Sequence, residues 1–255
     1  MNLAESSEFL GVIVVAGFFL LMVIFAILGR SRPLMGLRTI PAFARLSRAI
    51  GLAVEAGTRL HVSVGQGNLT SPGSAASFVG LAMLGRIART ASISDSPPVA
   101  SAGDGALAIL AQDTLRAGYR EVGAIEAFDP DYGRVTGLTP ISFAAGAMVL
   151  MAEENVSGNL LAGSFGTEAG LILEASDRNE AFSLSGTDHI PTQAMMFAAS
   201  QETLIGEELY AGGAYLRAGI GHTASLQAQD VVRWLLILMI MGGGLMKFVL
   251  GFLSP

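Results

Sequence analysis

Two glycines that directly follow a short apolar run are the first residues in the chain that could bind a ligand. The run Leu60–Val64 ends in Gly65-Gln66-Gly67. Glycines after a strand let the backbone approach a pyrophosphate, and the next helix N-terminus offers unpaired N–H donors. The third glycine of that fingerprint would fall at Thr70, and no acidic residue lies about twenty positions further on. Two interpretations stay open, a phosphate-type ligand site and a tight turn that closes a strand.

Two aspartates occupy similar places ahead of predicted helices. Asp104 and Asp188 each come shortly after a glycine and just before a helix, where carboxylates commonly accept hydrogen bonds from free backbone N–H groups. At the carboxyl ends of strands, the same side chains would lie where open α/β sheets bind ligands. His189 adjoins Asp188, which gives the sequence its one neighbouring acid and imidazole. The candidate ligand-binding residues are therefore Gly65, Gly67, Asp104, Asp188 and His189, and helix capping is the competing explanation for the aspartates.

The residue inventory offers little else for catalysis. The chain has no cysteine, which excludes disulfides, thiolate nucleophiles, Cys-ligated zinc and iron–sulfur clusters. It has three histidines, so a histidine-based metal site would also need carboxylate ligands. No G-x-S-x-G elbow, Walker loop or H-E-x-x-H helix occurs. We therefore predict no catalytic residue, no metal and no cofactor, and an enzymatic role has no positive support.

The elements that must position these residues follow from the hydrophobic pattern. Short apolar runs predict strands at Leu60–Val64, Pro98–Ala102, Val122–Ala127, Asn159–Ala162 and Ala181–Leu184. Longer Ala-, Met- and Leu-rich stretches predict helices at Gly73–Thr90, Gly105–Ala117, Pro140–Glu154, Thr167–Ala175 and Pro191–Leu209. This alternation is typical of an α/β fold with a largely parallel sheet and flanking helices.

Two segments of this region resemble each other. Val99–Tyr119 and Phe182–Tyr215 each contain a predicted strand, a glycine near an aspartate, and a helix with the order Gln, acid, Thr, Leu. Each also follows an apolar strand that ends in a glycine-rich turn. The spacing differs by several residues, so the sequence leaves open whether the fold consists of two duplicated halves.

Both ends of the chain contain an apolar stretch long enough to cross a bilayer. Phe9–Leu28 has no charged residue and reaches ~30 Å as a helix. A signal peptide would begin with a basic segment, whereas Glu5 and Glu8 precede this stretch, so we expect a retained anchor. The second stretch, Val231–Leu253, starts with basic and aromatic residues that suit a membrane interface.

Arginines set the predicted orientation. The segment between Gly29 and Leu60 contains one acidic residue, Glu55. It contains six basic residues, Arg30, Arg32, Arg38, Arg45, Arg48 and Arg59. The positive-inside rule places this segment in the cytoplasm and both termini outside. The predicted organisation is a transmembrane anchor over 1–29, a basic amphipathic helix over 30–59, a cytoplasmic α/β domain over 60–228 and a transmembrane helix over 229–255. Two roles stay open for the amphipathic helix: its arginines could lie against anionic lipid headgroups, or it is an ordinary helix packed on the domain.

The second apolar stretch contains unusual residues of its own. Gly242, Gly243 and Gly244 lack side chains and would allow close contact between helices. Lys247, the single lysine, either snorkels to the outer interface or faces a neighbouring helix or a polar path. We predict these four residues as membrane or oligomer contacts. Two spans cannot enclose a pore, so a channel would need an oligomer.

The stretch from Ala42 to Gly67, AFARLSRAIGLAVEAGTRLHVSVGQG, resembles the opening of an uncharacterised family of bacterial membrane proteins, a domain of unknown function. The resemblance extends loosely over the rest of the central region. It implies a location in the bacterial inner (cytoplasmic) membrane. It carries over no activity and no catalytic residues, because the family has none assigned.

Three functions are compatible with these features. The absence of catalytic motifs and the tethering at both ends favour a non-enzymatic, self-associating scaffold or accessory subunit, with the lipid bilayer, further copies of the chain and other membrane subunits as partners. A membrane-tethered sensory domain that binds a ligand or nucleotide is the alternative, and an oligomeric channel is the third. The net charge of −6 argues against nucleic acid as a partner.

Overall fold

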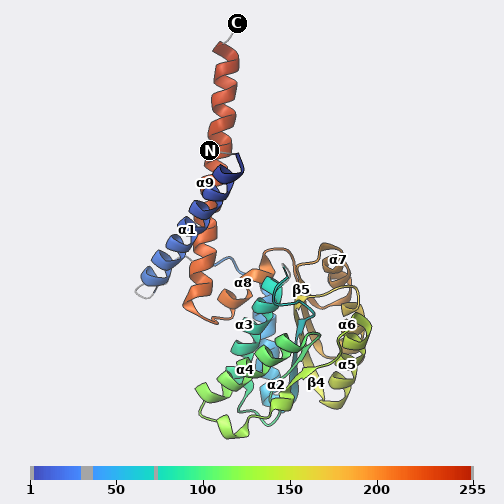
Figure 1. Ribbon diagram of the computed structural model, residues 1–255. Helices are drawn as coiled ribbons and strands as arrows, with labels where there is room; N and C mark the ends of the chain where they lie inside the picture. Colours follow the sequence, from blue (N-terminus) through green and yellow to red (C-terminus); the bar gives the residue numbers. More distant parts are fainter. Residues whose placement is uncertain (1–2, 30–36, 72–73, 254–255) are drawn as a thin grey trace. The chain divides into compact units, whose positions relative to one another are not determined.

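The chain folds into two compact units. The structure, a computed structural model, describes residues 3–29, 37–71 and 74–253 (Figure 1). One unit combines Met1–Leu37 with Gly219–Pro255, and the other comprises Arg38–Ala218. Arg30 and Arg32, on which the predicted orientation partly depends, lie outside the described residues.

The first unit consists of the two terminal helices, α1 (Leu3–Leu28) and α9 (Ile220–Leu253), which pack against each other. Their apolar segments, Glu8–Leu28 and Ile220–Phe248, have mean hydropathies of 3.0 and 1.7. Both helices are therefore long and apolar enough to span a membrane, which confirms the prediction of two terminal apolar helices. α9 begins earlier than the predicted start at Val231, because the polar residues before that point continue the helix.

The second unit is built on a six-stranded parallel sheet in the order β3-β2-β1-β4-β5-β6. The strands are β1 (Arg59–Gly65), β2 (Val99–Ala102), β3 (Gly133–Val135), β4 (Val156–Ser164), β5 (Phe182–Thr187) and β6 (Glu202–Leu204). The helices are α2 (Pro41–Ala56), α3 (Ser74–Ala91), α4 (Gly105–Glu121), α5 (Pro140–Glu153), α6 (Ala169–Arg178), α7 (Ile190–Ala199) and α8 (Glu208–Tyr215). The predicted α/β fold with a largely parallel sheet is confirmed.

The sheet consists of two halves with the same connectivity. The first half runs β1-α3-β2-α4-β3, and the second runs β4-α6-β5-α7-β6, with α5 as the crossover between them. Because parallel crossovers are right-handed, the helices of the two halves lie on opposite faces of the sheet. β2 and β5 are equivalent in this arrangement, as are β1 and β4. The two similar segments therefore begin on equivalent strands, β2 and β5. The order Gln, acid, Thr, Leu does not correspond, because it lies in α4 in the first segment and at β6 in the second.

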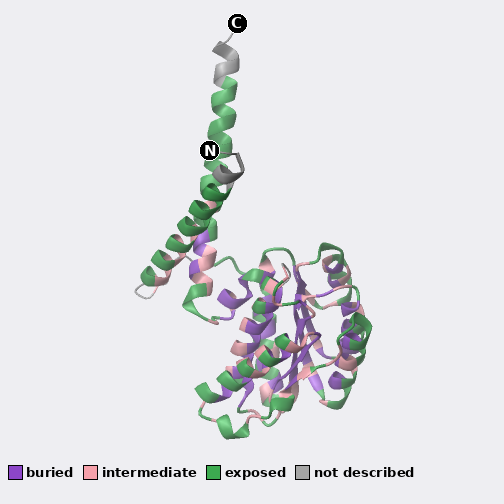
Figure 2. Ribbon diagram, in the orientation of Figure 1, coloured by how far each residue is buried: buried purple, intermediate pink, exposed green. Residues whose placement is uncertain are grey.

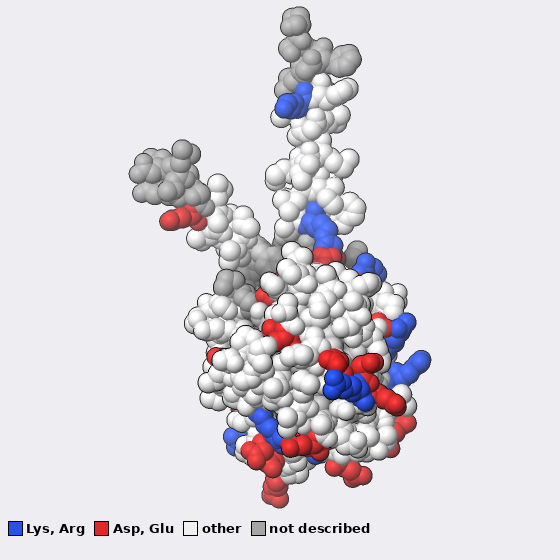
Figure 3. All heavy atoms as spheres, turned by 90° about the vertical axis from the view of Figure 1, so that its right-hand side faces the viewer, with Lys and Arg blue, Asp and Glu red and all other residues white. Residues whose placement is uncertain are grey.

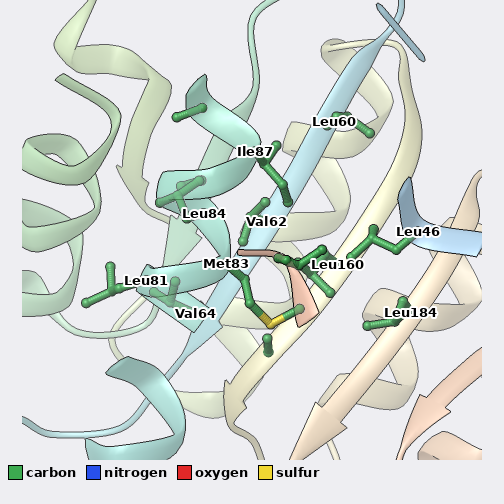
Figure 4. Packing of buried hydrophobic residues seen from close by; sticks show 14 of the residues in the cluster. Leu46, Leu60, Val62, Val64, Leu81, Met83, Leu84, Ile87, Leu160 and Leu184 are labelled. Carbon is green, nitrogen blue, oxygen red and sulfur yellow. The ribbon is translucent and has the colours of Figure 1, made fainter. Parts of the chain in front are cut away.

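The first face of the sheet is covered by α2, α3, α4 and α8 and has an apolar interior (Figures 1 and 2). Val62, Val64 and Leu160 of the strands pack against Met83 of α3 and Leu46 of α2 (Figure 4). Each such fully buried side chain stabilises the fold by about 1.5–3 kcal/mol. The apolar side of α2 is thus buried against the domain, which is the second of its two predicted roles.

The second face is covered by α5, α6 and α7, and its strand residues are partly polar. The buried His61 lies with Nδ1 2.7 Å from Asn159 Oδ1 and Nε2 2.8 Å from Ser101 Oγ. Since the amide oxygen can only accept, Nδ1–H donates to it, and Nε2 of this tautomer faces the hydroxyl of Ser101, which also bonds to Ser63 Oγ over 3.0 Å. Burial lowers the pKa of His61 to about 4, against a smaller raising effect of the Asn159 hydrogen bond. The ring is therefore neutral near pH 7.

Two predicted elements are wrong. No strand forms at Val122–Ala127. Val122 is the C-cap of α4, Gly123 has a φ of +74°, and a short 3-10 helix follows at Ile125–Ala127. The helix predicted over Pro191–Leu209 ends at Ala199. Ser200 is extended there, and its hydroxyl bonds to Glu202 as the chain enters β6. Both β3 and β6 are missing from the prediction because three-residue strands leave too short a pattern.

Candidate functional site

All the predicted ligand-binding residues lie along one edge of the sheet. Because the strands are parallel, the loops that follow them meet at the edge formed by their carboxyl ends, here called the carboxyl edge. It comprises the described loop residues 66–71, 103–104, 136–139, 165–168, 188–189 and 205–207. The chain leaves β1 and β4, which are neighbours, toward opposite faces of the sheet. Open α/β sheets bind ligands in the crevice at such a switch point.

Gly65 joins the two strands at the switch point. Its φ is +79°, and a Cβ at this position would overlap with the carbonyl group of Ser164 at the end of β4. The next residue, Gln66, donates its backbone N–H to that same carbonyl oxygen over 2.9 Å. Glycine is therefore required at position 65 both for the backbone conformation and for the close approach of β4.

Hydrogen bonds link the loops of four adjacent strands along this edge. The N–H of Gly103, after β2, donates to the carbonyl oxygen of Gly65 over 2.9 Å. After β4, the N–H of Phe165 donates over 3.1 Å to the hydroxyl of Thr187, the last residue of β5. The predicted residues of the two halves are thus connected through the loops after β1 and β4.

Asp104 caps α4. Its Oδ1 accepts the N–H groups of Ala106 and Leu107, at 3.0 and 3.1 Å. The structure therefore gives this residue the capping role, in which Oδ1 satisfies the helix N-terminus. The side chain lies at the carboxyl end of β2, beside the switch point.

Asp188 and His189 lie at the carboxyl end of β5, and neither side chain caps the helix that follows. α7 begins after His189 and has no side-chain cap. The imidazole Nδ1 of His189 lies 2.7 Å from the hydroxyl of Thr192, while the carboxylate of Asp188 accepts from Thr187 at 3.4 Å. The two side chains bond to different partners. Asp188 also raises the pKa of Tyr210 on α8, although burial of the phenol is the larger cause.

The loop that contains Gly67 differs from a dinucleotide-binding turn. In the fingerprint the helix begins within the glycine motif, whereas α3 begins only at Ser74. Gly67 is buried, and Asn68 then forms a local turn in which its side chain accepts the N–H of Thr70 over 3.1 Å. Pro72 and Gly73 lie outside the described residues.

A buried carboxylate at the switch point is absent from the predicted set. Glu168 precedes α6, is 7% exposed, and accepts the N–H of Gly166 over 2.7 Å. The sequence signal is an acid two residues after the glycine turn that ends β4, the position in the second half that corresponds to Gly65–Gly67 in the first. Spacing alone does not indicate that its carboxylate folds back toward the sheet.

The charge of the carboxyl edge limits what it can bind. The six loops contain the acids Asp104, Glu168, Asp188 and Glu207 and no lysine or arginine. Several hydroxyls and the N-termini of helices add donors. Among the residues that the structure describes, no group of three or more His, Asp and Glu side chains could hold a metal ion. The arrangement suits a small ligand with hydroxyl or amino groups better than an unshielded polyphosphate.

The predicted membrane contacts belong to the other unit. Gly242, Gly243, Gly244 and Lys247 all lie in α9 and are exposed. Cβ atoms at the three glycines would meet no atom within 4 Å in the described part of the chain. The predictions for these four residues stay predictions, since they concern contacts with lipid or with another chain.

Comparison with known proteins identifies the family of this chain. No curated protein and no solved structure matches the chain. One family model matches residues 1–254, and thus covers both terminal helices and the sheet between them. The predicted resemblance to an uncharacterised family is confirmed, and the chain belongs to the family described as Domain of unknown function (DUF6754).

Proposed function

We propose that this protein is a membrane-tethered domain that binds a small ligand at the carboxyl edge, beside the loops after β1 and β4. The observation that carries the proposal is the strand order β3-β2-β1-β4-β5-β6, with its switch point at these two strands. Gly65, Gly103 and the buried Glu168 surround this point. The role that we propose for this binding is sensory.

The ligand that we propose is neutral or cationic. The carboxylates of Asp104, Glu168 and Asp188 would repel a bare phosphate, because no arginine or lysine in the same loops offsets them. A ribose or another polyol can donate its hydroxyls to such carboxylates, and an amine can pair with them. A nucleotide would need Mg²⁺ to shield its phosphates.

Thermal stability of the full-length protein in mild detergent tests this proposal. The probes are adenosine, NAD⁺ with and without Mg²⁺, and a panel of amines and sugars. A ligand at about 100 times its Kd should raise Tm by roughly 5–10 °C. Glu168→Gln should abolish the shift, while Asp129→Asn, in a turn of the opposite edge, should keep it. No shift with any probe, or an equal shift in both variants, would reject the site.

The location that we propose is the cytoplasmic side of a bacterial inner membrane, with both termini outside. The arginines between Gly29 and Leu60 support this orientation by the positive-inside rule. The chain has no cysteine, so single cysteines introduced at Ala117 and at the N-terminus can report the side. In intact cells a membrane-impermeant thiol reagent should label the N-terminal cysteine and spare the one at position 117. The reverse pattern would contradict the orientation.

The predicted roles as scaffold, accessory subunit and channel stay predictions. Each of them requires contacts with further chains, and the proposed ligand site neither needs nor forbids such contacts.

A further inference from the structure

The outer sides of α5 and α7 consist almost entirely of apolar residues. On α5, Ile141 is 66% exposed and Val149 is 55% exposed, with the exposed Ala145 between them. On α7, Ile190 is 78% exposed and Phe197 is 67% exposed. α7 contains no charged residue, and α5 contains one, Glu153, its last. A helix that faces water normally carries polar residues on its outer side.

α6 lies between these two helices and joins their outer sides into one surface. It packs against both α5 and α7 and contributes Leu171, which is 38% exposed. Its charged residues lie in the second half of the helix, where Arg178 pairs with Glu174 over 2.5 Å. Figure 3 views the molecule from this side, where broad uncharged areas separate the charged groups. We call Ile141, Val149, Leu171, Ile190 and Phe197 the α5–α7 surface.

The α5–α7 surface approaches the size of a stable protein contact. Its five large side chains expose on the order of 500 Å² together, which is near the upper end for an apolar patch on a monomer. A standard interface buries about 800 Å² on each partner. Exposed small residues on the same helices, such as Ala145, Ala194 and Ala198, extend the patch toward that size.

The charges favour protein over lipid as the occupant. Helices that lie on a membrane surface usually carry many lysines and arginines beside their apolar face. The three helices contain one basic residue, Arg178, and Glu174 already neutralises it. Anionic headgroups would therefore find no counter-charge on this surface.

A second copy of the chain fits the surface best. In a two-fold contact the same patch meets itself, so any net charge on it would be repelled. The outer sides of α5 and α7 avoid this repulsion because their exposed residues are uncharged from Ile141 to Ala152 and from Ile190 to Ala199. Membrane tethering, as proposed above, would also hold copies in one plane and raise their effective concentration.

We propose that two copies of this protein associate through the α5–α7 surface around a two-fold axis. The contact gives the domain a homodimer interface on the face of the sheet opposite α2, α3 and α4. Its residue Phe197 lies in the last turn of α7, away from the carboxyl edge, so ligand binding and association can fail independently.

The mass of the full-length protein in mild detergent, measured over a range of concentrations, tests this interface. The wild type should be a dimer, and Phe197→Glu should weaken the dimer by at least about tenfold, as expected for a charged interface anchor. Ile109→Glu on α4 is the matched control, because Ile109 is 66% exposed, and it should leave the dimer unchanged. Ala194→Glu provides a second variant on α7, should Phe197→Glu aggregate.

Three results would overturn the proposal. If the wild type is monomeric at every concentration, a second copy of the chain does not bind this surface. A dimer that survives both α7 variants would place the association elsewhere, for example on α1 and α9. A different protein that co-purifies with the wild type and is lost in Phe197→Glu would show a foreign partner.

Discussion

The two helical layers of the α/β unit differ in construction. On the first face the interior is apolar, with Val62 and Leu160 against Met83, and the outer sides of α2, α3 and α4 carry arginines. On the second face the interior contains a polar network around His61, and the outer sides of α5 and α7 are apolar. A layer exposed to water has no reason to be apolar outside. The proposed dimer contact through the α5–α7 surface would account for this difference.

Because the interior of the first face is apolar and closely packed, a substitution that creates a cavity there should cause a large loss of stability. Leu184→Ala should lower the free energy of unfolding by about 2–5 kcal/mol, because Leu184 of β5 is fully buried in the apolar cluster beneath α2. Phe197→Ala on α7 removes a larger side chain that is mostly exposed, and in the monomer it should change stability by less than about 0.5 kcal/mol. Denaturant unfolding in detergent measures both. Equal losses would mean that Phe197 belongs to the core.

A pH dependence should come from the interior of the second face. His61 has its pKa lowered to about 4 in the folded protein, whereas a histidine in the unfolded chain has a pKa near 6.5. As the pH falls, the unfolded chain therefore becomes protonated at a higher pH than the folded protein. Stability should therefore be full above pH 6.5 and should fall, by on the order of 3 kcal/mol, as the pH drops toward 4. Carboxylates also contribute to acid unfolding.

The control for this prediction is a histidine at the surface. His189→Asn should keep the loss between pH 6.5 and 4, since His189 is exposed, while His61→Asn should remove the histidine part of it. An unchanged pH profile in His61→Asn would contradict a neutral buried imidazole.

A smaller effect is expected at the carboxyl edge. Asp104→Ala removes the cap of α4 and should cost about 1 kcal/mol. Asp113→Ala, on the exposed side of the same helix, should cost less than about 0.5 kcal/mol. Thermal unfolding compares the two. A cost at Asp104 no larger than at Asp113 would show that the carboxylate is not needed for capping.

The smallest effect should come from the ion pair on α6. Both side chains of the Glu174–Arg178 pair are more than half exposed, so Glu174→Gln should destabilise the monomer by only about 0.3–0.5 kcal/mol. The loss should shrink further in high salt. A loss of several kcal/mol would mean that this pair is buried, and that the outer side of the second layer is not as described.

Much of the fold could be predicted because long apolar runs leave a clear pattern. β1, β2, β4 and β5 all fall on predicted strands, and α3 to α6 on predicted helices. β3 and β6 are too short to show a period, and β6 lies inside a stretch that is helix-like in composition. The order of the strands, and with it the switch point, depends on contacts between distant segments that no local pattern records.

The candidate site was predictable only in part for the same reason. Gly65 ends β1, and Asp104 and Asp188 follow β2 and β5, so their place at the carboxyl edge could be predicted from strand and helix order. The buried state of Glu168 could not, since its side chain turns back toward Gly166. The partners of His61 are equally hidden, because Ser101 and Asn159 come from the neighbouring strands β2 and β4.

Thiol labelling in native membranes tests the contrast between the two layers most directly. The chain has no cysteine, so Ala194→Cys on α7 and Ala117→Cys on α4 each introduce one thiol at an exposed position. We predict that a membrane-permeant maleimide labels position 117 rapidly and position 194 slowly, and that Phe197→Glu restores rapid labelling at position 194. Equally rapid labelling of both positions in the otherwise unaltered protein would contradict a covered second layer.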